Sequence, residues 1–381
     1  MSGPLPSPIV RALAAAGPPG YDVPMAHANS KNAFEEREIL ILDGACGTNL
    51  QKVAIPASAW PGREGCNEWL NVTAPEIVVE LHRSFIEAGA QVLETNTFGA
   101  SDIVLAEYDL QDRVVEINAA AVANARAAIG GRPGCYVAGS VGPTTKLVSL
   151  GHTTVEALAA SLAAQMRALL DAGVDALIVE TCQDLLQVKT AAIAAFETMA
   201  AAKREVPLLV SVTLEQTGTM LVGSDIGAVC ATLEPFPVFS LGLNCATGPE
   251  AMSSHIRYLS HHWPRRISCA PNAGLPEVVD GKTVYRLTPQ DYATHLRAFV
   301  ERDGVSVVGG CCGTTPEHIR ALALALQGVK PAKRNVSWRD GGRSTARPGL
   351  LSADARRLPQ IAERNGAENR RLTNDEVPMM K

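Results

Sequence analysis

The sequence has no long apolar run, no strong charge of one sign and no regular cysteine spacing. Because no stretch contains 18 uncharged apolar residues, we expect no membrane-spanning helix. The formal net charge of −5 over 381 residues gives no reason to expect nucleic acid or an anionic membrane as a partner. Nine cysteines at irregular positions argue against a disulfide framework and favour a reducing compartment, the cytoplasm.

The two ends of the chain lack the periodicity of folded segments. Residues 1–37 are rich in Ala, Pro and Gly, and Arg11 is the only Lys or Arg among the first 30. We therefore expect a disordered leader rather than a secretory or transit signal, with Met25 as an alternative start. Residues 330–381 are polar and basic and are expected to form a disordered tail. These boundaries leave residues 38–329 for a single catalytic domain.

From Ile39 onward, short apolar runs alternate with helical patterns, two of which are Pro75–Ala88 and Val155–Leu170. The predicted strands are Ile39–Asp43, Gln91–Thr95, Tyr136–Ser140, Ala176–Glu180, Leu208–Thr213, Val238–Asn244, Ile267–Pro271 and Val305–Gly309. Repeated strand–helix units of this length predict a (β/α)8 barrel, the TIM-barrel fold of the α/β class. A doubly wound sheet is the alternative, but no G-x-G-x-x-G follows the first strand.

Three cysteines stand at the ends of predicted strands. Cys311 and Cys312 follow the last strand, and Cys245 follows the sixth. Neighbouring side chains on a strand point to opposite faces, but flanking glycines let the backbone turn so that both sulfurs of the pair converge. Three thiolates with one open position are typical of a reactive zinc site, because structural zinc sites usually have four protein ligands. Three buried structural cysteines are the alternative interpretation.

Polar side chains follow most of the predicted strands, at the end of a (β/α)8 barrel where active sites lie. These are Asp43 and Gly44, then Glu94, Asn96 and Thr97, then Ser140, Glu180, Asn244 and Asn272. If the fold is correct, they share one rim with the three cysteines, which favours the zinc site. Each carboxylate alone is also compatible with a structural role as a loop or helix cap. The six other cysteines are expected to be mostly small buried hydrophobic residues.

Taken together, these motifs resemble the homocysteine S-methyltransferase domain. The resemblance extends from about Ile39 to Gln327 and is carried by segments 43–48, 94–98, 139–143, 242–245 and 309–316. Gly-Gly-Cys-Cys-Gly-Thr, at residues 309–314, is the most specific of them. The amino-acid sequences of residues 94–99 and 67–71 are most similar to those of cobalamin-dependent methionine synthase.

The resemblance implies both the ligands and the reaction. It implies that Cys245, Cys311 and Cys312 bind zinc, and that Asp43 and Glu180 hold the homocysteine ammonium. Zinc lowers the pKa of the homocysteine thiol, and the thiolate attacks an activated methyl group to give methionine, without a protein acid or base. Gly44 and Asn244 are further candidates for substrate binding. The remaining rim candidates are Glu94, Asn96, Thr97, Ser140 and Asn272.

The methyl donor is the open question. The sequence lacks the D-x-H-x-x-G motif that supplies the cobalt-ligating histidine in the cobalamin-dependent enzymes. We therefore expect the homocysteine module of a split synthase, with methylcobalamin supplied by a separate cobalamin- and folate-binding partner. Residues 348–365 resemble the connection into the folate domain. One alternative is a self-sufficient enzyme that uses S-methylmethionine, betaine or S-adenosylmethionine. A zinc-binding protein without turnover is the other, but it would not need an amino acid pocket.

Overall fold

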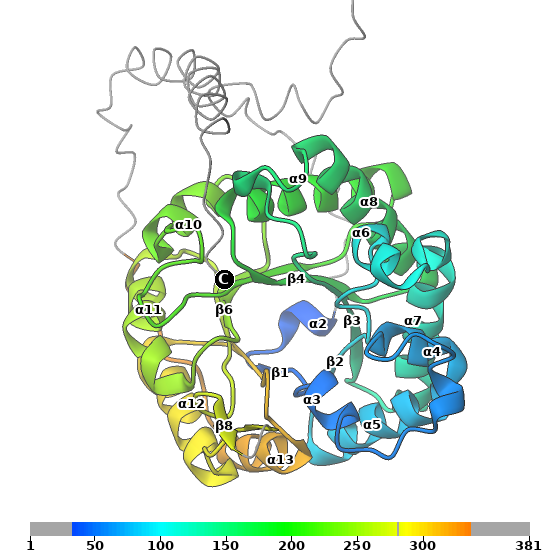
Figure 1. The fold of residues 1–381 in the computed structure, drawn as a ribbon. Helices are drawn as coiled ribbons and strands as arrows, with labels where there is room; N and C mark the ends of the chain where they lie inside the picture. Colours follow the sequence, from blue (N-terminus) through cyan, green and yellow to red (C-terminus); the bar gives the residue numbers. More distant parts are fainter. Residues whose placement is uncertain (1–32, 280–281, 337–381) are drawn as a thin grey trace, which may run out of the picture. The chain divides into compact units, whose positions relative to one another are not determined.

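Eight parallel strands surround a common axis in the computed structural model, which describes residues 33–279 and 282–336 (Figure 1). They are β1 (Leu40–Ile41), β2 (Val92–Glu94), β3 (Tyr136–Val141), β4 (Ala176–Cys182), β5 (Leu208–Val212), β6 (Ser240–Asn244), β7 (Arg266–Ala270) and β10 (Val307–Val308). Their order in the sheet is β1-β10-β7-β6-β5-β4-β3-β2, and a bridge between Leu42 and Val92 links β1 to β2. The predicted barrel and the centres of its predicted strands are confirmed.

Each barrel strand is followed by a longer helix on the outside of the barrel (Figure 1). These helices are α5 (Pro75–Ala88), α7 (Val114–Ile129), α8 (Val155–Ala172), α9 (Leu185–Ala202), α10 (Ile226–Leu233), α11 (Pro249–His262), α12 (Pro289–Asp303) and α13 (Pro316–Ala325). Proline opens α5, α11, α12 and α13, where its missing N–H leaves no hydrogen bond unmade. Both helices whose bounds were predicted are present. Helix α5 has the predicted bounds, and α8 extends two residues beyond its predicted end.

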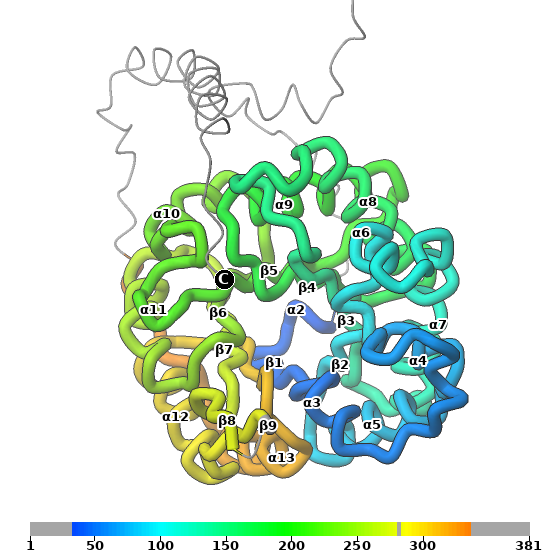
Figure 2. Tube along the Cα trace, in the orientation of Figure 1, coloured from blue at the N-terminus to red at the C-terminus, as the bar shows by residue number. Residues whose placement is uncertain are grey.

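Shorter elements occupy the loops. The short α-helices are α2 (Ala33–Glu36), α3 (Gly47–Leu50), α4 (Leu70–Thr73) and α6 (Asp102–Leu105). The 3-10 helices are η1 (Ala57–Ala59), η2 (Asn67–Trp69), η3 (Ala106–Tyr108), η4 (Gln111–Arg113) and η5 (Val148–Leu150). An antiparallel hairpin of β8 (Glu277–Val279) and β9 (Lys282–Val284), which the sequence analysis did not predict, lies between β7 and α12. Figure 2 shows this hairpin beside α13.

The barrel strands are buried on both faces. Leu40 and Leu42 belong to the core inside the barrel, whereas Ile41 between them packs in the layer of helices. This alternation is the ordinary geometry of a strand. It explains why the strands appear in the sequence as continuous apolar runs.

Helix α2 closes the end of the barrel where the strands begin, and it lies within the ring of strands in Figure 1. Its residue Phe34 is completely buried, and its ring centroid lies 5.2 Å from that of Tyr136 and 5.4 Å from that of Phe239. Helical structure therefore begins before residue 38, the predicted start of the domain. Four residues are too few to show a helical period, so the sequence pattern did not indicate α2.

The far end of the described chain also contacts the barrel. The backbone N–H of Ala332 donates to Val300, and the Arg334 guanidinium donates to the Trp263 carbonyl over 2.7 Å. Residues 1–32 and 337–381, with Met25 and segment 348–365, lie outside the described residues. No helix of the described residues has the length and apolar character to cross a membrane.

Substitution of Phe34 by alanine is expected to destabilise the barrel by about 3–5 kcal/mol, because it removes a large side chain from a filled core. Urea unfolding followed by circular dichroism measures the loss. The control is Val115→Ala on α7, whose side chain is 69% exposed, with an expected change within about 0.5 kcal/mol. Equal stability of the Phe34→Ala and Val115→Ala variants would contradict the role of α2 as a plug.

Candidate metal centre and substrate cavity

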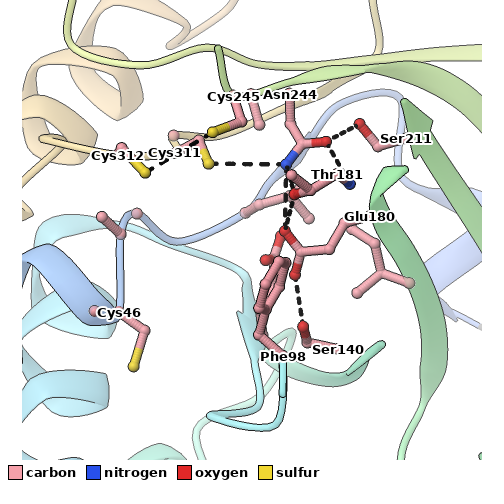
Figure 3. Close-up of a pocket in the computed structure, with 18 of the residues that line it drawn as sticks. Cys46, Phe98, Ser140, Glu180, Thr181, Ser211, Asn244, Cys245, Cys311 and Cys312 are labelled. Atoms are coloured by element: carbon pink, nitrogen blue, oxygen red, sulfur yellow. Dashed lines mark hydrogen bonds between the residues drawn. The ribbon is translucent and has the colours of Figure 1, made fainter. Parts of the chain in front are cut away.

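A cavity of about 340 Å3 opens at the end of the barrel where the strands finish (Figure 3). Its wall is built from residues near or just beyond the C-terminal ends of all eight strands, as the topology of the barrel requires. The predicted site residues that line it are Gly44, Glu94, Asn96, Ser140, Glu180, Asn244, Cys245, Cys311 and Cys312. The structure therefore brings these nine strand-end residues together at one cavity.

The sulfur atoms of Cys245, Cys311 and Cys312 all lie within 4.8 Å of one another, and those of Cys245 and Cys312 are 3.9 Å apart. Two sulfurs bound to one tetrahedral zinc ion at bond lengths of about 2.3 Å are about 3.8 Å apart. Among the described residues, these three form the only cluster of potential metal ligands of this kind. All three side chains are partly accessible from the cavity.

Backbone hydrogen bonds to the segment that follows β7 hold both cysteine loops. The N–H of Cys245 donates to Ala270, and the N–H of Cys311 donates to Pro271 over 2.9 Å. The carbonyl of Cys312 accepts from the N–H of Ala273 over 3.0 Å. Cys245 itself has a φ of 62°, a left-handed conformation that is unfavourable for a side chain and often marks functional sites.

The contacts among the three thiols favour the thiolate at Cys312, whereas the pKa values of Cys245 and Cys311 are raised. Hydrogen bonds from Cys245 and Cys311, and a further one from the Tyr285 hydroxyl, lower the pKa of Cys312. The contacts with Cys245 and Cys312, together with burial, raise the pKa of Cys311. A cluster that stabilises a thiolate is chemically suited to a divalent cation, because the thiolate is the form that binds metal.

The carboxyl groups of buried Glu180 and half-buried Glu94 form another part of the cavity wall. Glu180 accepts a hydrogen bond of 2.5 Å from the Ser140 hydroxyl and shares another with Glu94. Burial raises the pKa of Glu180, and burial together with the charges of Glu180 and Asp43 raises that of Glu94 well above its usual range. Buried like charges are unfavourable without a cation, so this part of the cavity suits a positively charged group.

Asp43 lies behind the cavity wall rather than on it. Its carboxylate accepts hydrogen bonds of 3.3 Å from the backbone N–H of Glu94, and its Oδ2 is 3.9 Å from Nδ1 of His82 on α5. Burial, and then the negative charge of Glu180, raise the pKa of Asp43, while the N–H of Glu94 opposes the shift. Asp43 is thus coupled electrostatically to Glu180 on the cavity wall, although its own side chain is not part of the lining.

Asn244, at the end of β6, stands between the carboxylate and the sulfurs (Figure 3). Its Nδ2 is 3.3 Å from Glu180 Oε2 and 3.7 Å from Cys311 Sγ. The side chain therefore connects the anionic and sulfur-rich parts of the cavity.

Two predicted rim residues do not line the cavity. Thr97 is fully buried and donates to the Ser140 carbonyl, so it supports the loop from behind. Asn272 is buried after β7, and its Oδ1 has no hydrogen-bond partner within the described part of the chain. Of the six other cysteines, Cys66, Cys182, Cys230 and Cys269 are buried as predicted, whereas Cys46 reaches the cavity and Cys135 is partly exposed.

Several polar residues at the site were not among the predicted site residues. Glu68, Thr181 and Ser211 line the cavity, and the Tyr285 ring lies against Gly313, beside the double cysteine. Glu68 lies in the Asn67–Asn71 motif, so that motif was a signal for it. Thr181 follows Glu180 directly, whereas Ser211 and Tyr285 carry no sequence signal of their own.

Comparison with known proteins places this site in a family. Residues 40–326 match the family described as homocysteine S-methyltransferase. The chain is 42% identical over 338 residues to methionine synthase of Mycobacterium tuberculosis and 44% identical over 294 residues to that of Mycobacterium leprae. These matches cover 87% and 76% of this chain but only 28% and 24% of the relatives, so the chain spans about a quarter of their length.

Comparison with solved structures agrees with this family match. The metallated form of the homocysteine methyltransferase MmuM from Escherichia coli is 28% identical, with a TM-score of 0.61, and the match covers 76% of this chain and 97% of that one. The oxidised form of the same enzyme gives the same TM-score at 27% identity. With the family match over three quarters of the sequence, these findings show that the chain belongs to the homocysteine S-methyltransferase family.

Proposed function

We propose that this protein binds zinc through Cys245, Cys311 and Cys312 and methylates the thiol of homocysteine to form methionine, using a methyl group that a cobalamin-carrying protein domain delivers. The observation that supports it best is the shared cavity, which has three clustered sulfurs on one side and buried carboxyl groups on the other. A substrate with a thiol at one end and an ammonium at the other matches both sides.

The sulfur cluster fits zinc by its donor set and by its spacing. Three cysteine sulfurs within 4.8 Å of one another are compatible with three positions of a tetrahedron, and the adjacent cavity leaves the fourth accessible. Zinc at this position would lower the pKa of a bound thiol, so that homocysteine would be a thiolate at neutral pH. No general base beside the sulfurs is needed for that ionisation.

The amino acid end of homocysteine is assigned to the carboxylates. Glu180 lines the cavity and has its orientation fixed by Ser140, so it is the first candidate for the ammonium. Glu94 shares a hydrogen bond with Glu180 and would interact with the same ammonium group. Asp43 contributes charge from behind the wall, and Gly44 lines the cavity on the β1 side. Paired carboxylates and an ammonium make charge-assisted hydrogen bonds, which are stronger than neutral ones.

The cobalamin-dependent donor is inferred from the relatives. Identity is 42–44% with the two mycobacterial methionine synthases but 27–28% with the E. coli enzyme MmuM. The match to the M. tuberculosis protein covers 87% of the chain, more than residues 40–326 alone. The likeness of segment 348–365 to a synthase connection stays a prediction. Cobalamin itself and its carrier would come from a partner, and a cytoplasmic location remains a prediction.

An apolar rim around the cavity supports docking of a protein donor. Among the described residues, nine large apolar side chains are exposed, and seven of them lie between a barrel strand and the longer helix that follows it. This apolar rim consists of Val53, Phe98, Leu150, Leu221, Leu275, Val278 and Val279. These residues belong to the loops that follow five of the strands, at the end of the barrel where the cavity opens, so a domain that covered this rim would sit over the cavity.

A self-sufficient enzyme with a small methyl donor is the second candidate. The chain covers 97% of the E. coli homocysteine methyltransferase MmuM, so a barrel of this size is sufficient for such an enzyme. A zinc-binding protein without turnover is disfavoured, since the buried carboxylates of Glu180 and Glu94 would then face the cavity without a purpose.

Substitution of Glu180 by glutamine is expected to raise the KM for homocysteine at least about 100-fold, because loss of a buried charge partner costs about 3–5 kcal/mol. The value of kcat should fall much less, since the ammonium is remote from the reacting sulfur. Steady-state kinetics with varied homocysteine measure both. Glu156→Gln, on the exposed first turn of α8, is the matched control. An unchanged KM in the Glu180→Gln variant would remove Glu180 from the substrate site.

Zinc-loaded protein is expected to form methionine from homocysteine and free methylcobalamin, because its site needs only an activated methyl group next to the thiolate. Parallel reactions contain S-methylmethionine, betaine or S-adenosylmethionine and should give no turnover. Methionine is quantified by mass spectrometry, with metal-depleted protein as the control. Turnover with one of the small donors, and none with methylcobalamin, would favour the self-sufficient enzyme instead.

A further inference from the structure

The side-chain amide of Asn244 makes five contacts with protein atoms (Figure 3). Its Oδ1 accepts from the backbone N–H of Thr181 over 2.9 Å and from the Ser211 hydroxyl over 2.7 Å. Its Nδ2 is 2.7 Å from Thr181 Oγ1 and also approaches Glu180 and Cys311. Asn244 is only 4% exposed, so these contacts use its hydrogen-bonding groups and leave little for a substrate.

The orientation of this amide is set by the backbone. The N–H of Thr181 is always a donor, so the atom that faces it must be the oxygen of Asn244. The nitrogen is consequently directed at the Glu180 carboxylate and at the Cys311 sulfur, both of which accept. Thr181 itself has a φ of 59°, so the backbone beside Glu180 is held in a left-handed conformation that this contact stabilises.

The shared nitrogen limits the distance between the two parts of the cavity. Nδ2 lies 3.3 Å from Glu180 Oε2 and 3.7 Å from Cys311 Sγ, and these two distances add to an upper limit of 7.0 Å between the oxygen and the sulfur. Glu180 is also held from its other side by the Ser140 hydroxyl. The Glu180 Oε2 atom therefore cannot lie more than 7.0 Å from the Cys311 sulfur unless one of these two contacts is lengthened or broken.

Building on the proposed function, we propose that Asn244 is a positioning residue that sets the spacing between the ammonium site and the sulfur site, and thereby selects homocysteine over cysteine. Homocysteine has four bonds between its nitrogen and its sulfur, and cysteine has three. The missing C–C bond is about 1.5 Å long. A misplacement of about 1 Å can cost about 100-fold, so a fixed spacing is sufficient to reject the shorter thiol.

The test measures thiol binding as well as turnover. The protein is loaded with Co2+, whose thiolate charge-transfer absorption reports ligation by an added thiol, and dissociation constants are determined for L-homocysteine and L-cysteine. The informative variant is Asn244→Asp, which has the same shape and keeps an oxygen for Thr181 and Ser211 but loses the NH2 donor. Asn244→Ala is the second variant. Gln327→Glu is the matched control, because it makes the same amide-to-acid change at an exposed position after α13.

The unmodified protein and Gln327→Glu are expected to prefer homocysteine by about 100-fold. In Asn244→Asp and Asn244→Ala the preference should fall by at least about tenfold, with the absorption of the thiol-free cobalt protein unchanged. The ratio of the two kcat/KM values with zinc should fall in parallel. An unchanged homocysteine-to-cysteine ratio in both variants, with both affinities weakened equally, would reduce Asn244 to a structural residue while leaving the proposed function intact. If neither thiol changed the cobalt absorption of the unmodified protein, the positioning role of Asn244 and the proposed function would both be overturned.

Discussion

The hydrogen bonding of β7 to its neighbours β6 and β10 is the constraint on which the site depends. β6 precedes Cys245, and β10 precedes the double cysteine. The register is held tightly, since a Cβ added at Gly242 would lie 1.9 Å from the Ser268 carbonyl oxygen on β7. Both cysteine loops then bond to residues 270–273, so sulfurs that are 66 residues apart in the sequence meet at the end of one strand.

The same end of the barrel brings together several acidic side chains without a basic side chain among the cavity-lining residues. Burial raises the pKa of Asp43, Glu94 and Glu180, which means that ionising all three together is unfavourable without a nearby cation. Three cysteines add a cluster that favours a thiolate. A site of this kind gains stability when cations enter, because each neutralises charge that burial has made unfavourable. Zinc and a substrate ammonium would bind to different parts of one cavity, so neither would displace the other.

Much of this architecture could be predicted from the sequence. Buried parallel strands give apolar runs, and the strand–helix alternation identified the barrel, its strands and the convergence of Glu180 with the cysteines. The elements that were missed have other causes. Helix α2 is too short to show a period, and its importance comes from the packing of Phe34 in three dimensions. The β8–β9 hairpin did have a signal, since Asp280-Gly281 is typical of a hairpin turn.

The side-chain directions were beyond the sequence pattern. Asp43 and Glu180 both follow strands, yet only Glu180 faces the cavity, because the carboxylate of Asp43 is held by the N–H of Glu94. Thr97 and Asn272 likewise sit at strand ends without lining the cavity. The role of Asn244 depends on five contacts from three strands or the residues after them, which no local motif encodes. Position along a strand thus predicts where a residue is, whereas its hydrogen bonds decide what it faces.

The most direct test of the central claim is X-ray absorption at the zinc edge of the zinc-loaded protein, with and without homocysteine. The proposal predicts three sulfur neighbours at about 2.3 Å and one lighter ligand in the free protein, and four sulfur neighbours after homocysteine is added. A Cys245→Ser variant should have one sulfur fewer in each state. Four sulfurs before the substrate is added, or a spectrum that homocysteine leaves unchanged, would contradict the claim that this cavity brings the substrate thiol to a three-cysteine zinc site.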